Sequence, residues 1–256
     1  MRIIEATVDF RVMLDMKRII KKLFNKAPFI EGIAKKLYQN IVVPNKETQV
    51  FPGSERYWER RYSDGANSGA GSYGRLAEFK ADVLNSFVAT HDVQTVIEFG
   101  CGDGNQLKLA HYNAYRGFDV SQTAIRKCRD LFNSDERKSF DLISAYDGEK
   151  ADLSISLDVI YHLIEDSVFD KYMRTLFNAS NTYVIIYSSN YEQVGGGTSA
   201  HVRHRNFTSW VENHLSDWEL ADHLPNRYPY DPRSLDGSFA EFYFYKHHPR
   251  LDETNS

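Results

Sequence analysis

The stretch from Thr95 to Val120 constrains the fold more than any other part of the sequence. A short apolar and β-branched run, residues 96–99, has the pattern of a buried strand. It leads directly into GCGDG at positions 100–104, with glycines at alternate positions. Glycine turns the chain without a Cβ clash and lets a ligand approach the backbone closely. The stretch therefore predicts a strand followed by a tight binding loop in an α/β fold.

A second acidic residue follows the loop at a spacing that nucleotide-binding α/β units share. Asp119 lies near the end of the apolar segment 117–120, about 20 residues after the first glycine, where a carboxylate can reach ribose hydroxyls. A dinucleotide site would have the pattern G-x-G-x-x-G, so that pyrophosphate meets helix N-terminal amides. Here the pattern is G-x-G-x-G, preceded by Glu98 and without Lys or Arg from Gly100 to Leu107. This favours a ligand with a ribose, an amino acid part and a positive charge.

At Glu98, the glycine loop and Asp119, the chain resembles the class I S-adenosylmethionine-dependent methyltransferases. The resemblance extends over roughly residues 57–245 and implies an α/β, Rossmann-like fold. We therefore expect a seven-stranded, mostly parallel sheet with helices on both faces, a final antiparallel hairpin and a helical N-terminal extension. The resemblance also implies S-adenosyl-L-methionine as the cofactor and S-adenosyl-L-homocysteine as its product. No metal is expected, because the acids and histidines form no ligand-like cluster in the sequence.

Periodicity predicts the remaining elements of this sheet. Apolar runs and alternation predict further strands at 139–143, 151–157, 183–187, 218–224 and 239–245. Helical spacing predicts helices over 76–87, after a cap at Ser121, from Ser167, and from a capping box at Ser209.

The segment ADLSISLDVIYHL, residues 151–163, is the second informative stretch. Its strand is predicted to end at Leu157 and Asp158, and ligands of open α/β sheets bind beyond the carboxyl ends of strands. We therefore expect Asp158, Tyr161 and His162 to lie beside the cofactor. In the resembled family, an aspartate at this position lies close to the methyl group that is transferred. His162 has two open interpretations, a general base or a cap on the strand end.

The predicted cofactor-binding residues follow from these motifs and from the resemblance. They are Ser72, Tyr73, Gly74, Glu98, Gly100, Gly102, Gly104, Asn105, Asp119, Val120, Asp141, Leu157 and Asp158. The first three belong to a long, small and polar loop, 63–74, that many relatives use as a lid, and Asn67 is a further candidate there. A plain flexible linker is the alternative for this loop. Asp141 and Asp147 both compete to be the acid that reads adenine.

The segment HVRHR places four cationic or cationisable side chains within five residues. His201, Arg203, His204 and Arg205 suit a phosphate, a carboxylate or another anionic substrate, and a histidine here could act as a base toward a sugar hydroxyl. The alternative is a solvated basic turn before a helix. The predicted catalytic residues are His162, His201 and His204. The predicted substrate-binding residues are Tyr161, Arg203 and Arg205.

Charge is distributed unevenly along the chain. Lys17 to Lys36 holds seven basic residues and one acid, a net charge of +6, so the rest of the chain carries −10 and the total is −4. Apolar residues at helical spacing around Pro28 predict two amphipathic basic helices. They favour either contact of residues 1–40 with a membrane surface or partner enzyme, or a helical hairpin packed on the domain. The expected domains are a helical extension and linker over 1–50, the methyltransferase domain over 51–248 and a tail over 249–256.

Composition narrows the function classes. Two cysteines make no disulfide framework, no apolar run reaches the roughly 18 residues of a membrane span, and no signal peptide is seen. We therefore expect a soluble, cytoplasmic protein, with membrane association left open. Outside the N-terminal segment the chain is acidic and carries no RNA-binding motif, which disfavours nucleic acid as the substrate.

The most specific functional interpretation rests on the resemblance. The polar loop, DVIYHL and HVRHR resemble methyltransferases found with surface-polysaccharide biosynthesis. This implies O-methylation of a saccharide or of an anionic, phosphoryl or carboxyl, small molecule. The alternatives are a methyltransferase on another small molecule or on nucleic acid, and a non-catalytic cofactor-binding scaffold that acts through its N-terminal helices.

Overall fold

The structure is a computed structural model that describes residues 51–193, 199–231, 233 and 237–248. The expected N-terminal extension and the tail lie outside the described residues, as do the glycines at 195–197. The amphipathic-helix interpretation of residues 1–40 therefore stays a prediction.

The described chain forms one seven-stranded sheet in the order β3-β2-β1-β4-β5-β7-β6. Its strands are β1 (Thr95–Phe99), β2 (Ala114–Asp119), β3 (Lys138–Leu142), β4 (Ala151–Leu157), β5 (Ser180–Ser188), β6 (Trp218–Leu224) and β7 (Glu241–His247). Strands β1 to β5 pair in parallel, whereas β7 runs antiparallel to both β5 and β6. The Rossmann-like sheet and its final antiparallel hairpin are confirmed. Each predicted strand is present, with bounds that differ by three residues or fewer.

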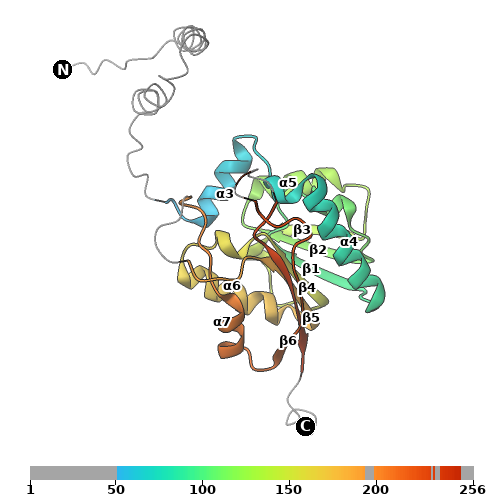
Figure 1. Cartoon of the computed structure of the whole chain (residues 1–256). Coiled ribbons are helices and arrows are strands. Elements are labelled where there is room, and N and C mark those ends of the chain that lie inside the picture. The colour runs from blue at the N-terminus through green and yellow to red at the C-terminus, as the bar shows by residue number, and fades with distance from the viewer. Residues whose placement is uncertain (1–50, 194–198, 232, 234–236, 249–256) are drawn as a thin grey trace, which may run out of the picture. The chain divides into compact units, whose positions relative to one another are not determined.

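Helices cover both faces of the sheet (Figure 1). The helices are α3 (Ser54–Ser63), α4 (Gly74–Thr90), α5 (Gln122–Leu131), α6 (Asp166–Asn178) and α7 (Phe207–His214). Short 3₁₀ turns are η2 (Ala70–Ser72), η3 (Gln106–Leu109), η4 (Ile143–Ala145) and η5 (Ile160–His162). Helices α4 and α5 share one apolar core with the sheet, and α6 and α7 share the other. None of the described helices is long and apolar enough to cross a membrane.

Capping side chains set where two of the helices begin. Helix α5 starts after Ser121, whose side chain accepts a hydrogen bond from the Ala124 N–H at 3.1 Å, as predicted. The prediction that Ser209 caps α7 was wrong. Asn206 is the cap, and its side-chain oxygen accepts from the Ser209 N–H. Asparagine caps as well as serine does, and it places the helix start three residues earlier.

The connection from β3 to β4 is unusually short for a parallel crossover. Parallel strands are ordinarily joined by a dozen or more residues, most often an α-helix. Here residues 143–150 contain only the turn η4, and Tyr146 covers the sheet by packing edge-on against Phe99 and Phe118, at 5.2 and 5.4 Å between ring centroids. This short connection and one face of α6 line the same cavity.

Candidate functional site

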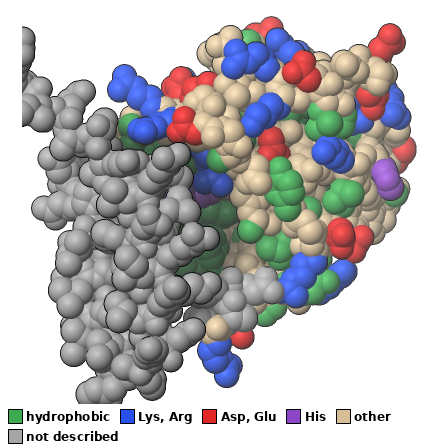
Figure 2. Space-filling model, turned by 90° about the horizontal axis from the view of Figure 1, so that it is seen from above, with side chains coloured by type: hydrophobic (Ala, Val, Ile, Leu, Met, Phe, Trp, Pro, Cys, Tyr) green, Lys and Arg blue, Asp and Glu red, His purple; other side chains and the backbone are tan. Residues whose placement is uncertain are grey.

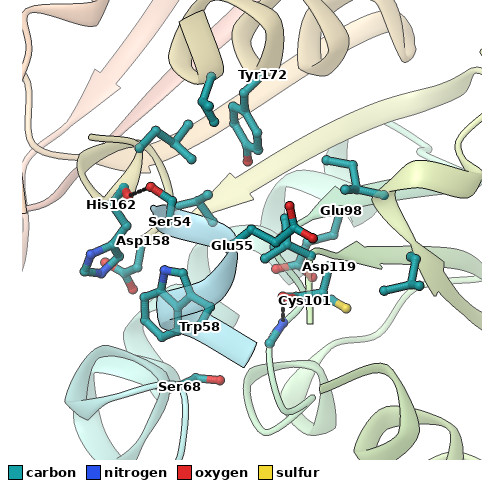
Figure 3. Close-up of a pocket in the computed structure, with 18 of the residues that line it drawn as sticks. Ser54, Glu55, Trp58, Ser68, Glu98, Cys101, Asp119, Asp158, His162 and Tyr172 are labelled. Carbon is teal, nitrogen blue, oxygen red and sulfur yellow. Dashed lines mark hydrogen bonds between the residues drawn. The ribbon is translucent and has the colours of Figure 1, made fainter. Parts of the chain in front are cut away.

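A cavity of about 1110 Å³ opens at the carboxyl ends of β1, β2 and β4 (Figure 3). Its walls come from the glycine loop, the strand ends, helix α3 and one face of α6. In Figure 3 the side chains of Glu98 and Asp119 lie on one side of the view and those of Asp158 and His162 on the other, with Trp58 between them. Ordinary ligand pockets measure roughly 300–1,000 Å³. This cavity therefore has room for two small ligands.

The glycine loop adopts the conformation that only glycine accepts readily. Gly100, Gly102 and Gly104 have φ of 87°, 59° and 75°. A Cβ on Gly100 would lie 2.4 Å from Val159 Cγ2, and one on Gly102 would lie 2.4 Å from Ser68 Oγ. Gly100 and Gly102 line the cavity, whereas Gly104 packs against α5 and does not. The loop thus presents backbone, rather than side chains, to the cavity.

Asp119 stands at the end of β2 and links the loop to helix α5. Its carboxylate accepts the Gly102 N–H at 2.9 Å and the Ser121 N–H at 2.8 Å. Burial raises the pKa of Asp119 to about 6, although these backbone N–H groups act in the opposite direction. Asp119 and the adjacent Val120 both line the cavity, so the spaced acid lies where a ligand can reach it.

Glu98 is a second buried acid on the cavity wall, in strand β1. Tyr115 donates its hydroxyl hydrogen to this carboxylate at 2.6 Å. Burial raises the pKa of Glu98 to about 7, while the Tyr115 hydrogen bond and the nearby Lys80 ammonium act in the opposite direction. A buried carboxyl that titrates near neutral pH points to a functional site.

Asp158 follows β4 in a strained backbone conformation. Its φ of 60° is left-handed, which costs a non-glycine residue free energy and is typical of functional positions. Lys80 donates to Asp158 Oδ2 at 2.6 Å, and the Tyr161 hydroxyl donates to Oδ1 at 2.8 Å. Asp158 and Leu157 line the cavity, whereas Tyr161 supports Asp158 from outside the lining.

Helix α3 lines the cavity and is held by hydrogen bonds at its start and at its middle. At its start, the Ser54 hydroxyl contacts the His162 carbonyl at 2.8 Å and Glu165 at 2.9 Å. Further along, the Glu59 carboxylate accepts hydrogen bonds from the Ser121 hydroxyl at 2.6 Å and from the Thr123 hydroxyl at 2.7 Å. Helix α3, which precedes the first strand, thus forms one wall of the cavity. The sequence did not predict this helix.

Of the predicted lid contacts, only one reaches the cavity. Ser72 lines it, whereas Tyr73 and Gly74 do not. The Tyr73 hydroxyl donates to Asp103 at 2.8 Å, and the Asn105 amide donates to the Ser72 carbonyl at 2.7 Å. Tyr73 and Asn105 therefore hold the glycine loop against the lid instead of facing a ligand.

Neither candidate adenine acid lines the cavity. Asp141 is held by Arg116 at 3.3 Å and Arg129 at 2.7 Å, outside the lining. Asp147 is exposed in the turn before β4. The cavity wall next to Asp141 is instead mostly apolar and aromatic, with Leu142, Ile143 and Tyr146, and includes the polar Ser144.

His162 lies on the cavity wall in one definite tautomer. Its Nδ1 is 2.8 Å from the His201 carbonyl oxygen, which can only accept a hydrogen bond. Nδ1 therefore carries the ring hydrogen in the neutral state, and Nε2 keeps its lone pair. Burial lowers the pKa of His162 to about 4. At neutral pH this ring is an uncharged hydrogen-bond acceptor.

The HVRHR segment does not supply the expected anion site. Arg203 and Arg205 both pair with Asp166, at 2.8 and 3.0 Å, and both donate to the Ile164 carbonyl. The Arg205 side chain is only 8% exposed. His204 contacts the Ser189 hydroxyl at 2.7 Å. None of these side chains lines the cavity, and the two arginines direct N–H groups to backbone carbonyls and to Asp166 instead.

His201 acts on the site indirectly. Its carbonyl orients His162, and its ring stacks on Tyr57 of α3, at 4.6 Å between centroids. Its own ring is not in the cavity lining. The segment thus braces His162 and helix α3.

Several cavity residues were missed in the sequence. Trp58 and Tyr62 come from the unpredicted helix α3, and the α6 face that ends at Thr175 lines the cavity together with the short connection after β3. Lys80 had a visible signal, because it lies four residues from both Leu76 and Leu84 on the apolar stripe of α4. A lysine on such a stripe is buried only with a partner.

The charged side chains of the cavity are mostly acidic. Five carboxylates (Glu55, Glu98, Asp119, Asp158 and Glu165) and three cations (Arg56, Lys80 and Lys171) line it, a formal balance of −2. Among the described residues, no three His, Cys, Asp or Glu side chains gather as metal ligands would. The cavity therefore suits a ligand that carries positive charge.

On the described part of the face in Figure 2, Lys and Arg side chains are interspersed with Asp and Glu. A surface that binds nucleic acid gathers its basic residues into a patch or stripe. This face therefore offers no support for nucleic acid as the substrate.

Comparison with solved structures places the fold among methyltransferases. The methyltransferase domain of a bacterial Hen1 (CtHen1) matches with a TM-score of 0.52 and 20% identity, over 67% of this chain and all of that one. The N-methyltransferase NodS from Bradyrhizobium japonicum, in complex with S-adenosyl-L-homocysteine, matches with 0.58 and 14%, over 76% and 98%. Magnesium protoporphyrin IX methyltransferase (ChlM) from Synechocystis, with the same molecule bound, matches with 0.53 and 15%, over 85% and 99%.

No family model and no curated protein matches the sequence. At these identities the structural likeness shows a shared fold. The activity is inferred from the site.

Proposed function

We propose that this protein is an S-adenosyl-L-methionine-dependent methyltransferase. One arrangement carries the proposal: Glu98, just before a left-handed glycine loop, and Asp119, at the end of the next strand, place their carboxylates with that loop on the wall of a large cavity at the carboxyl edge of the sheet. The fold that the chain shares with methyltransferases is consistent with it.

The residues of the cavity fit the parts of this cofactor. Asp119 is a hydrogen-bond acceptor for ribose hydroxyls, and Leu142, Ile143 and Tyr146 offer an apolar wall for adenine. The acidic balance of the cavity favours a positively charged sulfonium. When bound, the cofactor supplies an activated methyl group, so the protein has to orient the acceptor and exclude water.

For the acceptor, we propose a saccharide or a small molecule that carries an anionic group. The face of α6 and the start of α3 line the part of the cavity near His162, where Trp58 provides an aromatic surface and Glu165 and Ser167 provide polar groups. Such a mixture of one aromatic ring and several hydrogen-bonding groups suits a ring that bears hydroxyls. An anionic substituent would meet Arg56 or Lys171, because Arg203 and Arg205 are engaged within the protein.

His162 has a defined part in this proposal. A general base works best when its pKa lies near the working pH, and a histidine with a pKa of about 4 is a weak base at neutral pH. We propose that His162 Nε2 accepts a hydrogen bond from the acceptor and orients it. As the S–CH3 bond breaks and the O–CH3 bond forms, the acceptor oxygen becomes strongly acidic, and its proton passes to His162 Nε2 and from there to solvent.

The test is transfer of a labelled methyl group from S-adenosyl-L-methionine to a panel of acceptors. The panel contains neutral saccharides, sugar phosphates, primary amines and RNA, and the label is followed by scintillation and mass spectrometry. We expect label on a saccharide or sugar phosphate, and a kcat reduced roughly tenfold to a hundredfold in His162→Ala. Label on amines or RNA alone would contradict the proposed acceptor. Failure to bind the cofactor would contradict the proposed enzyme.

A further inference from the structure

Two buried polar groups on the cavity wall are left with spare hydrogen-bonding capacity. The Lys80 side chain is 1% exposed, and an ammonium has three N–H donors. One of them is donated to Asp158, and the cation lies 5.2 Å from the centre of the Tyr187 ring. No other acceptor for Lys80 is found among the described residues. The second group is Gln106 Oε1, which is buried and has no hydrogen-bond partner there.

The orientation of the Gln106 amide is determined by its other end. Gln106 Nε2 donates to the Ala77 carbonyl of helix α4 at 3.0 Å. A carbonyl oxygen can only accept, so the nitrogen must face Ala77 and the oxygen must face away. Ala77 and Lys80 are three residues apart on the same helix and so lie on the same side of it. A donor and an acceptor are thus anchored side by side on the cavity wall.

An unsatisfied buried polar group costs free energy unless a ligand supplies the missing hydrogen-bond partner. A bare anion at Lys80 would be repelled by two carboxylates. Asp158 is hydrogen-bonded to Lys80, and Glu98 is close enough for the Lys80 ammonium to act on its pKa. Figure 3 shows both carboxylates at the cavity. A zwitterion matches this surrounding, because its carboxylate meets the lysine while its ammonium meets acceptors. Gln106 Oε1 is such an acceptor.

We propose that Lys80 and Gln106 form the subsite for the amino acid end of the cofactor. Lys80 donates to the carboxylate, and Gln106 Oε1 accepts from the α-ammonium. Asp158 is a positioning residue that holds the lysine. This inference rests on the proposed function, because it assigns one end of the same ligand.

The test uses pairs of ligands that differ only in this end, with isothermal titration of the full-length protein. S-adenosyl-L-homocysteine and 5′-methylthioadenosine share adenine, ribose and a neutral sulfur, and only the first has an amino acid end. We expect the wild type to bind the first at least roughly tenfold more tightly. Lys80→Met should reduce that preference roughly tenfold to a hundredfold, and Gln106→Met roughly threefold to tenfold, with no change for methylthioadenosine.

Two further measurements separate the roles. Decarboxylated S-adenosylmethionine keeps the ammonium and lacks the carboxylate, so Gln106→Met should weaken it and Lys80→Met should not. Lys246→Met removes an exposed lysine of β7 that does not line the cavity, and it should leave every preference unchanged. If Lys80→Met does not fold, the double variant Lys80→Met, Asp158→Asn removes both charges of the pair.

The outcomes are distinguishable. If the wild type binds S-adenosyl-L-homocysteine and 5′-methylthioadenosine with equal affinity, the inference is overturned without any variant. An equal loss for both ligands in Lys80→Met also overturns it, because Lys80 would then act only through Asp158. No binding of any adenosyl ligand to the wild type contradicts the proposed function itself.

Discussion

Cofactor binding should weaken on acidification, because the two buried acids beside the glycine loop titrate close to neutral pH. The pKa of Asp119 is about 6 and that of Glu98 about 7, both raised by burial. Ribose hydroxyls and a cationic ligand favour the ionised carboxylates, so affinity is full above these pKa values. It is lost as the pH falls through about 7 and then about 6.

The magnitude follows from the ionised fractions. Between pH 7.5 and 5.5 the ionised fraction falls roughly fourfold for a pKa near 6 and roughly 25-fold for a pKa near 7. If both ionised acids are needed, the dissociation constant for S-adenosyl-L-methionine rises roughly a hundredfold. Titration calorimetry at half-unit pH steps measures this directly.

Folding stability without the cofactor should follow the opposite trend. Both acids have a folded-state pKa above the reference values of 3.8 and 4.5, so the folded protein holds these protons more tightly than the unfolded chain. Their contribution to the free energy of unfolding is therefore full below about pH 4 and falls as the pH rises to about 7. Urea titrations across this range report it.

A matched variant separates Glu98 from every other titrating group. Glu98→Gln keeps the Tyr115 hydrogen bond and removes the charge. It should weaken binding at pH 7.5 and come within roughly twofold of the wild type at pH 5.5, where Glu98 is mostly protonated. An affinity that is flat with pH, or that rises on acidification in the wild type, would refute this reasoning.

Three further predictions concern the walls of the site. Gly102→Ala should lower the free energy of unfolding by roughly 1–3 kcal/mol more than Gly65→Ala in urea titrations. Both glycines have positive φ, but only at Gly102 would an added Cβ clash, with Ser68 Oγ. Equal losses in the two variants would show that the clash is relieved. Arg205→Met should lower the free energy of unfolding by roughly 1–3 kcal/mol, because the Leu163 and Ile164 carbonyls lose their donor, and it should leave the acceptor KM unchanged; a raised KM at unchanged stability would restore a substrate-binding role. Glu59→Ala should speed cofactor release roughly threefold to tenfold in stopped-flow measurements by loosening helix α3, and an unchanged release rate would show that α3 does not gate the cavity.

The parts of the fold that depend on local sequence were predictable. A glycine loop between two apolar strands, with Asp119 at a defined spacing, has few structural solutions, and the seven strands follow from short apolar runs. Ser121 was identified as a cap because its signal is contained within four residues. The error at Ser209 came from the same kind of signal, since Asn206 caps equally well and lies three residues away.

The site residues that depend on tertiary contacts were harder to predict. A sequence shows that Arg203 and Arg205 are charged, but it does not show that Asp166 and the carbonyls after η5 use their donors. Asp141 follows the same rule, since its arginine partners come from a neighbouring strand and a helix. Lys80 is the opposite case. Its position on the apolar stripe of a helix predicts from the sequence that it is buried with a partner, although not which residue that partner is.

The central claim is that the cavity binds S-adenosyl-L-methionine through the glycine loop and Asp119. The most direct test is a calorimetric titration of the wild type with S-adenosyl-L-methionine and, separately, with NADH, repeated with Asp119→Ala. We predict micromolar binding of the first ligand alone, with the affinity lost in the variant. Binding of NADH, or S-adenosyl-L-methionine binding that the variant retains in full, would contradict the assignment of this cavity.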